Sequence, residues 1–426
     1  SLSQGAATAL ALSLKSELGD VSFDGSLAAD RSLGGALKAD VPSARKLGAW
    51  LGKDLPAGGG LGKLSLSAKI AHTTGLTEFT GLRLALDGAT VTGLLSVETG
   101  GVRPRVTGQL AAGPLDLNPY MQTGAQAGAA TPVQGWSKAP IAVDALRKFD
   151  ADLSFTVQSL LIRKLTVGKA ALHVVLADGV LNANLDPMTL YGGSGRARID
   201  VDAHDRVPRL GIDLSFEDVS MASLLGDALG VNKIEGIGKL TLNAASSGAS
   251  ADAIMRALSG KGTIQIGNGR IRGVNLGMVA QTVKSVLGGD ATGAGAATDF
   301  THLGGSFVIA KGVLTNNDFT LAGPVLSATG RGNIDIGHRS IDFTVVPKAD
   351  VALANVSVPF RIRGPWSKPG YLPDLGSLAG NLIQGMANGT GNAGGLLGGL
   401  IGDGKPSSGS PPKDAGGLLG GLFGRH

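Results

Sequence analysis

The stretch Lys63-Leu64-Ser65-Leu66-Ser67-Ala68-Lys69-Ile70 alternates polar and apolar side chains, and Gly332-Asn333-Ile334-Asp335-Ile336 repeats the pattern much later in the chain. Successive side chains of an extended strand point to opposite faces of a sheet, so this alternation predicts half-buried strands. The same pattern recurs through most of the 426 residues. We therefore expect a mainly β chain whose strands have one apolar face and one polar face.

Short turn signals separate the alternating stretches. They are Ala177-Asp178-Gly179, Gly267-Asn268-Gly269 and Asn316-Asn317-Asp318, each of which supplies residues that tolerate a positive φ. Strands joined by such short turns pair with their neighbours in the chain. This spacing predicts consecutive antiparallel hairpins.

Glycine precedes several of the alternating stretches, as in Thr107-Gly108-Gln109-Leu110 and Thr329-Gly330-Arg331-Gly332. Glycine inside a strand permits bulges and bending. We therefore expect a long curved antiparallel sheet with an apolar, groove-like concave face. Chance resemblance among glycine-rich hairpins is the alternative interpretation of this imperfect repeat.

Three segments break the alternation with the spacing of helices, and they predict short amphipathic helices over residues 41–52, 220–229 and 275–287. Residues 124–134 and 288–297 lack periodicity and are typical of loops. After Pro373 the chain is rich in Gly, Ser and Pro, apart from one short predicted helix over 377–386. The tail repeats Ala-Gly-Gly-Leu-Leu-Gly-Gly-Leu at 393–400 and 415–422, which favours disorder or, alternatively, contact with a membrane or partner through its leucines.

Composition excludes several classes of protein. The net charge is only +5, and Lys and Arg are scattered singly, so no basic stripe suited to nucleic acid is present. The chain has no cysteine, which excludes disulfides and thiolate metal sites but fits both reducing and oxidising compartments. No run approaches the roughly 18 apolar residues of a membrane-spanning helix, and we expect any membrane anchor to lie before Ser1 in a longer protein.

Catalytic motifs are absent from the sequence. The six histidines lie far apart and show no paired spacing of the kind that binds zinc. The segment from Gly399 to Lys405 comes nearest to a phosphate-binding loop, but Pro406 occupies the position of the required hydroxyl. No Gly-x-Ser-x-Gly elbow occurs, and the carboxylates stand singly at turns. We expect neither enzymatic activity nor a cofactor or metal.

Two blocks of motifs in residues 136–374 resemble the C-terminal region of the AsmA family. The downstream block includes Lys311-Gly312-Val313-Leu314-Thr315-Asn316-Asn317-Asp318-Phe319. It closes with the segment from Ser357 to Pro369, which contains Phe360-Arg361-Ile362-Arg363-Gly364-Pro365-Trp366, and with Pro373-Asp374. The upstream block includes Trp136-Ser137-Lys138-Ala139-Pro140 and Leu190-Tyr191-Gly192-Gly193. Residues 1–120 resemble the family only in style. Phe319 and Asn275 depart from the residues that such proteins commonly carry, without affecting any chemistry.

This resemblance divides the chain into a β-rich N-terminal part (1–121), a loop (122–135), the AsmA-like region (136–374) and a tail (375–426). It implies a periplasmic protein of a Gram-negative envelope, anchored to the inner membrane by an absent N-terminal helix. Its implied role is outer-membrane biogenesis, with phospholipid or another acyl lipid as ligand, a possible outer-membrane partner, and no nucleic acid.

A lipid carrier needs a continuous apolar lining, because each exposed methylene costs roughly 0.8 kcal/mol. We predict that this lining is formed by apolar residues at strand spacing: Leu165, Val167, Leu172, Val174, Phe307, Ile309, Phe319, Leu321, Ile334, Ile336, Ile341, Phe343 and Val345. A closed core between sheet and helices is the alternative use of these residues. A non-enzymatic scaffold that assists outer-membrane protein assembly through an exposed edge strand is the alternative function. The irregular repeat argues against a β-solenoid adhesin.

Overall fold

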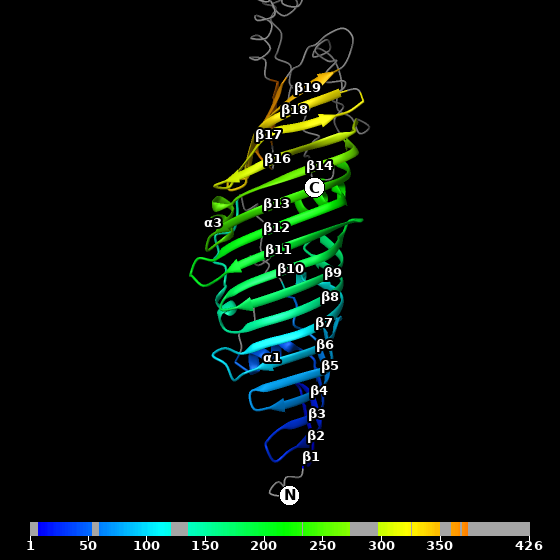
Figure 1. Cartoon of the computed structure of the whole chain (residues 1–426), viewed down its shortest axis with the longest axis vertical. Helices are drawn as coiled ribbons and strands as arrows, with labels where there is room; N and C mark the ends of the chain where they lie inside the picture. The colour runs from blue at the N-terminus through cyan, green and yellow to red at the C-terminus, as the bar shows by residue number, and fades with distance from the viewer. Residues whose placement is uncertain are drawn as a thin grey trace, which may run out of the picture. The chain divides into compact units, whose positions relative to one another are not determined.

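The computed structural model describes residues 7–52, 59–120, 135–231, 233–272, 297–324, 326–349, 359–366 and 369–373 (Figure 1). The predicted helices at 275–287 and 377–386, the predicted loops at 124–134 and 288–296, and the predicted disordered tail lie outside these residues. In the described part, no helix is long and apolar enough to cross a membrane.

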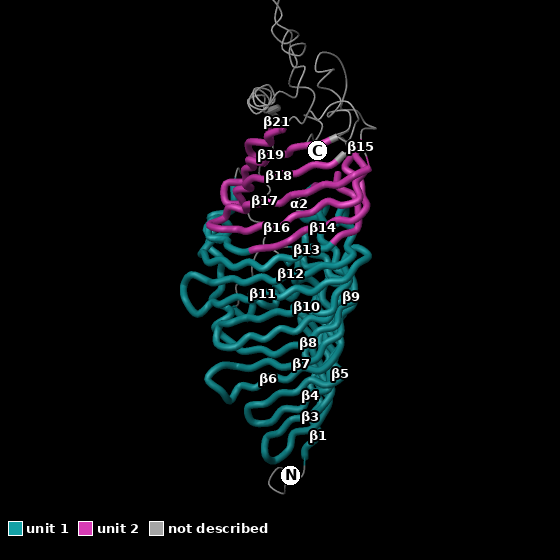
Figure 2. Tube along the Cα trace, turned by 45° about the horizontal axis from the view of Figure 1, so that its top comes forward, with its two compact units in different colours: residues 1–230, 239–260 teal, residues 231–238, 261–426 magenta. Residues whose placement is uncertain are grey.

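The chain divides into two compact units (Figure 2). Unit 1 comprises Ser1–Gly230 and Lys239–Gly260, and unit 2 comprises Val231–Gly238 and Lys261–His426. Two strands, β13 (Ile234–Ser247) and β14 (Ser259–Arg272), have residues in both units. The boundaries predicted at 121, 135 and 374 follow family resemblance and composition, and they stay a prediction.

The described residues of unit 1 form mainly strands, three short α-helices and two 3-10 helices, η2 (Asn118–Tyr120) and η3 (Asp144–Arg147). The strands are β1 (Thr8–Ser16), β2 (Gly19–Leu27), β3 (Leu33–Val41), β4 (Leu64–Thr73), β5 (Leu76–Leu86), β6 (Ala89–Glu98), β7 (Arg105–Asp116), β8 (Asp150–Ile162), β9 (Leu165–Ala177), β10 (Val180–Leu190), β11 (Gly193–Asp202) and β12 (Arg209–Ser220). The α-helices are α1 (Ala44–Trp50), α2 (Met221–Leu229) and α3 (Ala251–Ala257).

Each strand of unit 1 from β1 to β12 pairs with the next one in the chain, so the strands lie side by side in sequence order (Figure 1). The expected antiparallel arrangement is confirmed for these pairs with one correction. β7 and β8 run parallel, with Arg105 opposite Asp150 and Asp116 opposite Leu161. A parallel pair needs a long connection, which residues 117–149 provide.

Unit 2 contains, besides its part of β13 and β14, the strands β15 (Ala297–Phe300), β16 (His302–Ala310), β17 (Val313–Ala322), β18 (Leu326–Asp335), β19 (Ser340–Ala349), β20 (Phe360–Pro365) and β21 (Gly370–Pro373). From β16 onward each strand pairs antiparallel with the next. The prediction of a mainly β chain with an open, curved antiparallel sheet and few helices is confirmed within both units.

Of the three predicted turns, one is confirmed. Asp178 and Gly179 have φ of 50° and 77° between β9 and β10, as a tight hairpin turn requires. The turn predicted at Gly267-Asn268-Gly269 is wrong, because these residues lie inside β14. The turn predicted at Asn316-Asn317-Asp318 is also wrong, since this segment forms a bulge within β17.

The helices predicted over 41–52 and 220–229 are confirmed as α1 and α2. Helix α3 is not among the predicted helices. Its signal in the sequence is the N-cap, where the Ser250 hydroxyl accepts a hydrogen bond from the Ala253 N–H. Helix α2 lies against β9 and β12. Its Asp227 accepts a 2.5 Å hydrogen bond from the Tyr191 hydroxyl, which itself accepts one from the Thr166 N–H.

Asp87 connects the segment after α1 to the strands. Its carboxylate accepts hydrogen bonds from the N–H groups of Leu61 and Gly62 and from the Tyr120 hydroxyl at 2.7 Å. The hydrogen bond from Tyr120 holds the pKa of Asp87 below its usual value. Partial burial, together with this bond, raises the pKa of Tyr120 to about 12.

The Tyr120 contribution to stability should disappear in alkali. Its folded-state pKa exceeds the ordinary value, so the contribution is fully present below about pH 10 and is lost as the pH rises through about 12. Tyr120→Phe should therefore be less stable than the wild type by about 1 kcal/mol near neutral pH. Urea unfolding of both proteins across this pH range measures the difference, and a gap that stays constant would contradict the assignment.

Candidate functional site

The cross-strand register of unit 1 brings apolar side chains into rows that cross all the strands from β1 to β12. One row consists, in strand order, of Leu14, Val21, Ala39, Leu66, Leu84, Val91, Ala112, Val157, Ala170, Met188, Gly195 and Phe216. Residues directly opposite each other on paired strands share a face. The row is therefore one uninterrupted apolar line across unit 1.

A second row runs beside the first and is also apolar. It consists of Leu10, Gly25, Gly35, Ile70, Phe79, Leu95, Gly108, Leu153, Val174, Ala183, Ile199 and Ile212. Between the two rows lie Leu12, Phe23 and Leu37 of β1–β3, and Leu110, Phe155 and Leu172 of β7–β9. We call these residues the apolar face of unit 1.

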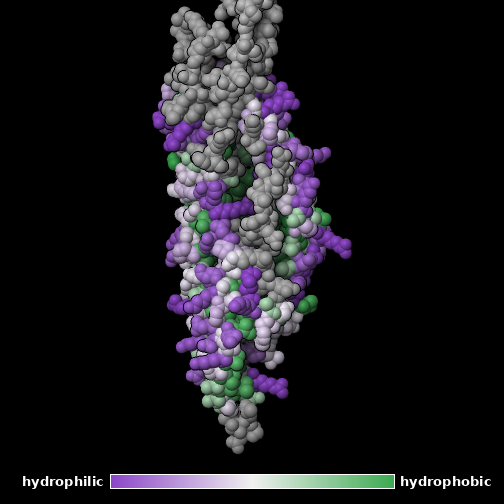
Figure 3. All heavy atoms as spheres, turned by 180° about the vertical axis from the view of Figure 1, so that it is seen from behind, coloured by the Kyte–Doolittle hydropathy of each residue, from purple (hydrophilic) through white to green (hydrophobic). Residues whose placement is uncertain are grey.

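The opposite face of the same strands is polar. Ser13, Ser22, Lys38, Ser67 and Arg83 face one another across β1 to β5 at positions that alternate with the apolar rows. Figure 3 looks at the molecule from behind, and in its lower part apolar residues gather in a band between polar margins. The two faces therefore differ in polarity as the alternation predicts.

The four predicted lining residues of β9 all lie opposite apolar residues. Leu172 and Val174 face Phe155 and Leu153 on β8, while Leu165 and Val167 face Ile162 and Leu160. Val167 and Ala170 are both buried although they are three positions apart. The alternation of inward and outward side chains therefore shifts by one residue between them. These four side chains thus lie against apolar residues of β8. Val167 is buried and the other three are half-buried.

The lining residues predicted in unit 2 form a second set, the apolar face of unit 2. Ile309, Leu314, Ile334 and Ile341 stand in one row across β16 to β19. Leu321 lies opposite Leu303, and Val345 lies opposite Phe360. Half-buried Phe307 is on the same strand face as buried Ile309, two residues on. Ile336 lies just beyond the end of β18, and its N–H donates to the Gly312 carbonyl.

Phenylalanine rings cover glycines on both apolar faces. A Cβ on Gly195 would lie 2.5 Å from a ring atom of Phe216, its partner on β12. A Cβ on Gly330 would lie 2.8 Å from Phe343 and 2.9 Å from Phe319, two rings that meet edge to face at 6.0 Å. At these positions glycine leaves space for a ring from a neighbouring strand. The sequence predicted only that glycines permit bending of the strands.

The bulge in β17 orients Phe319. Asp318 accepts hydrogen bonds from the N–H and hydroxyl of Ser306 on β16, at 2.8 and 2.7 Å, and from the side-chain amide of Asn316. The Asn316 side-chain oxygen accepts the Phe319 N–H at 3.2 Å. The hydroxyl and N–H of Ser306 lower the pKa of Asp318. These family-motif residues are therefore structural: they lock the strand so that Phe319 faces the apolar side.

Asp318→Asn should remove an acid-sensitive contribution to stability. A carboxylate with a lowered pKa stabilises the folded state above its unfolded value near pH 4, and this contribution is lost as the pH falls through the folded value. Because Asp318 is exposed to solvent, we expect a loss below about 1 kcal/mol. Urea midpoints at about pH 6 and about pH 3 test this: the gap between variant and wild type should close in acid, and a gap that widens would refute it.

The apolar face of unit 1 is most exposed at β1. Leu12 is 56% and Leu14 64% exposed, whereas Leu176, Met188 and Leu190 on β9 and β10 are at most 4% exposed. None of the predicted lining residues lies on β1 to β7, although apolar and polar residues alternate in these strands as well. The face therefore extends well beyond the predicted residues.

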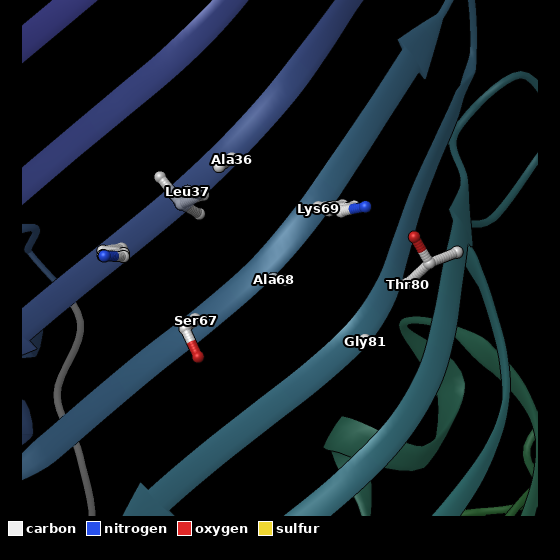
Figure 4. Close-up of a pocket in the computed structure, with 8 residues that line it drawn as sticks. Ala36, Leu37, Ser67, Ala68, Lys69, Thr80 and Gly81 are labelled. Atoms are coloured by element: carbon white, nitrogen blue, oxygen red, sulfur yellow. The ribbon is translucent and has the colours of Figure 1, made fainter.

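A shallow open depression of about 420 Å³ lies over β3, β4 and β5 (Figure 4). Lys38, Ser67, Lys69 and Thr80 from the polar face line it together with the bulged Gly81. Its two lysines are exposed, so it lacks the enclosed polar groups of a small-molecule site. Among the described residues, no group of three or more His, Cys, Asp or Glu side chains is placed to hold a metal ion.

Comparison with known proteins finds two matches. The model of the AsmA family matches residues 44–319. Protein AsmA of Escherichia coli (strain K12) is 25% identical over 261 residues, which cover 58% of this chain and 42% of that protein. The chain thus spans less than half the length of this curated relative. No solved structure matches significantly. The family match starts at residue 44, within a segment where we expected only weak resemblance.

Proposed function

This chain belongs to the AsmA family, and from that premise we propose that it binds or conducts acyl lipid between the inner and outer membranes in outer-membrane biogenesis. Membership supports such a role at the level of the family, which is not generally described as enzymatic. The observation that carries the proposal is the apolar face of unit 1, with its two unbroken rows across β1 to β12. We propose a periplasmic location and an inner-membrane anchor for the full-length protein.

The dimensions of the face suit an extended apolar ligand. Paired strands lie about 4.8 Å apart, so twelve strands offer an apolar path of roughly 50 Å. Each methylene that leaves a bilayer loses roughly 0.8 kcal/mol, and an apolar row recovers this energy only if it has no polar gap. The rows contain alkyl side chains, one methionine, phenylalanine and glycine but no charged residue.

Native mass spectrometry of the purified protein, with extraction of bound lipid, tests the proposal. A photo-crosslinking residue at Phe307 or Ile334 places the test on the apolar face of unit 2. We expect co-purified lipid and a lipid adduct at both positions, while the same residue at exposed Val308 on the polar face should give little adduct. Absence of both lipid and adducts would refute the proposal.

One observation favours a second function, a scaffold that assists outer-membrane protein assembly. Among the described strands β1 pairs only with β2, and it leaves Leu12 and Leu14 exposed beside its free edge. Edges of this kind accept a further strand from another polypeptide. Crosslinks from Leu12 to outer-membrane proteins, without lipid adducts at Phe307 or Ile334, would favour the scaffold.

A further inference from the structure

Strand β18 carries small residues at three successive positions on the apolar face of unit 2. They are Ala328, Gly330 and Gly332, which lie opposite Pro347, Val345 and Phe343 on β19. The residues opposite them on the neighbouring strands have larger side chains, so the apolar face is shallowest in side chains along β18. The rings of Phe319 and Phe343 lean into the space above Gly330 from the two sides.

Gly330 and Gly332 differ in what a side chain would meet. A Cβ on Gly332 would collide with backbone atoms of Asp342 and Phe343, so a larger residue there would disrupt strand pairing. A Cβ on Gly330 would meet chiefly the two rings, with the nearest backbone atom, the Thr344 oxygen, at 3.2 Å. A substitution at Gly330 can therefore be accommodated by moving the rings.

The sheet backbone lies beneath both rings and prevents them from moving deeper into the sheet. A side chain at position 330 would lift Phe319 and Phe343 away from the sheet, into the space over the apolar face. The same space must hold an acyl chain if one lies on β17 to β19.

We propose that Gly330 is a positioning residue, which keeps the rings of Phe319 and Phe343 close to the sheet so that an acyl chain can pass over them. This inference rests on the proposed function, since it specifies how lipid contacts the apolar face of unit 2. It assigns to the glycine a role in ligand clearance in addition to strand geometry.

Gly330→Val in the full chain tests the inference. We expect bound lipid in native mass spectrometry, and photo-adducts at Ile334, to fall roughly fivefold or more, because a displaced edge-to-face pair obstructs the path. Gly330→Ala should give a smaller fall in the same direction, and it keeps the test valid if the valine variant does not fold. Circular dichroism and thermal unfolding establish that each variant is folded.

Two further variants distinguish obstruction of the acyl-chain path by the rings from a general weakening of the sheet. Thr329→Val changes the neighbouring residue on the polar face of β18 and should leave lipid occupancy unchanged. Combining Gly330→Val with Phe343→Ala removes a displaced ring and should restore most of the bound lipid. A folded Gly330→Val protein with wild-type occupancy, or a double variant without recovery, would overturn the role of Gly330. Absence of lipid from the wild type would instead refute the proposed function.

Discussion

Met221→Ala is expected to lower the free energy of unfolding of unit 1 by about 2–5 kcal/mol. Met221 is the first residue of α2, and its exposed fraction is 0%, as is that of Val219 two residues earlier. Truncation to alanine removes buried methylene and sulfur contacts and leaves a cavity that the paired strands cannot close. Helix α2, which lies against β9 and β12, would lose a fully buried side chain.

A second methionine provides the matched control for this change. Met255 lies in α3 and is only half-buried, so Met255→Ala should cost about 1 kcal/mol or less. Urea unfolding followed by circular dichroism measures the loss, and amide hydrogen exchange shows whether α2, β9 and β12 open first. Equal losses for the two variants would contradict the assignment of Met221 to the core.

The faces of the strands could be predicted because alternation is a local property of the sequence. Leu64, Leu66 and Ile70 fall on one face whichever strands become their neighbours. The rows could not be predicted, since they depend on register, which is set by turns and by packing between strands. Leu66 meets Leu84 only because β4 and β5 pair as they do, with a bulge at Gly81.

Long-range hydrogen bonds explain the wrong turn at Asn316-Asn317-Asp318. These residue types favour turns when only their own backbone is considered. In the folded protein the Asp318 carboxylate instead satisfies Ser306 on β16, twelve positions earlier in the chain, and a bulge replaces the turn. Local sequence could not predict that rings cover Gly330 either, since Phe319 and Phe343 reach it from two other strands.

The parallel pairing of β7 and β8 also lies beyond a local interpretation. Val106, Leu110 and Ala112 lie an even number of positions apart, as the apolar residues of the antiparallel strands do. Only the path of the chain between Asp116 and Asp150 decides the direction in which β8 enters the sheet. The apolar face tolerates this reversal, because Leu110 and Ala112 still lie opposite Phe155 and Val157. Continuity of the face thus depends on the side-chain alternation rather than on strand direction.

Leu66→Glu should reduce bound lipid roughly tenfold or more. Leu66 is the third residue of β4, lies in the first apolar row between Ala39 and Leu84, and is half-buried. A carboxylate at this position would lose its hydration if an acyl chain lay against it, or it would stay hydrated and interrupt the apolar row. Either outcome weakens lipid binding by more than the loss of a single apolar contact would. Native mass spectrometry with lipid extraction measures the loss.

Ser67→Glu supplies a control that differs from this variant only in the face that receives the charge. Ser67 is the next residue on β4, equally half-buried, and lies opposite Lys38 and Arg83 on the polar face. A glutamate there gains two cationic neighbours, so Ser67→Glu should keep both its fold and its lipid. If both variants fold and bind as much lipid as the wild type, ligand does not lie on the rows of unit 1. If both lose lipid equally, net charge and not the apolar face governs binding.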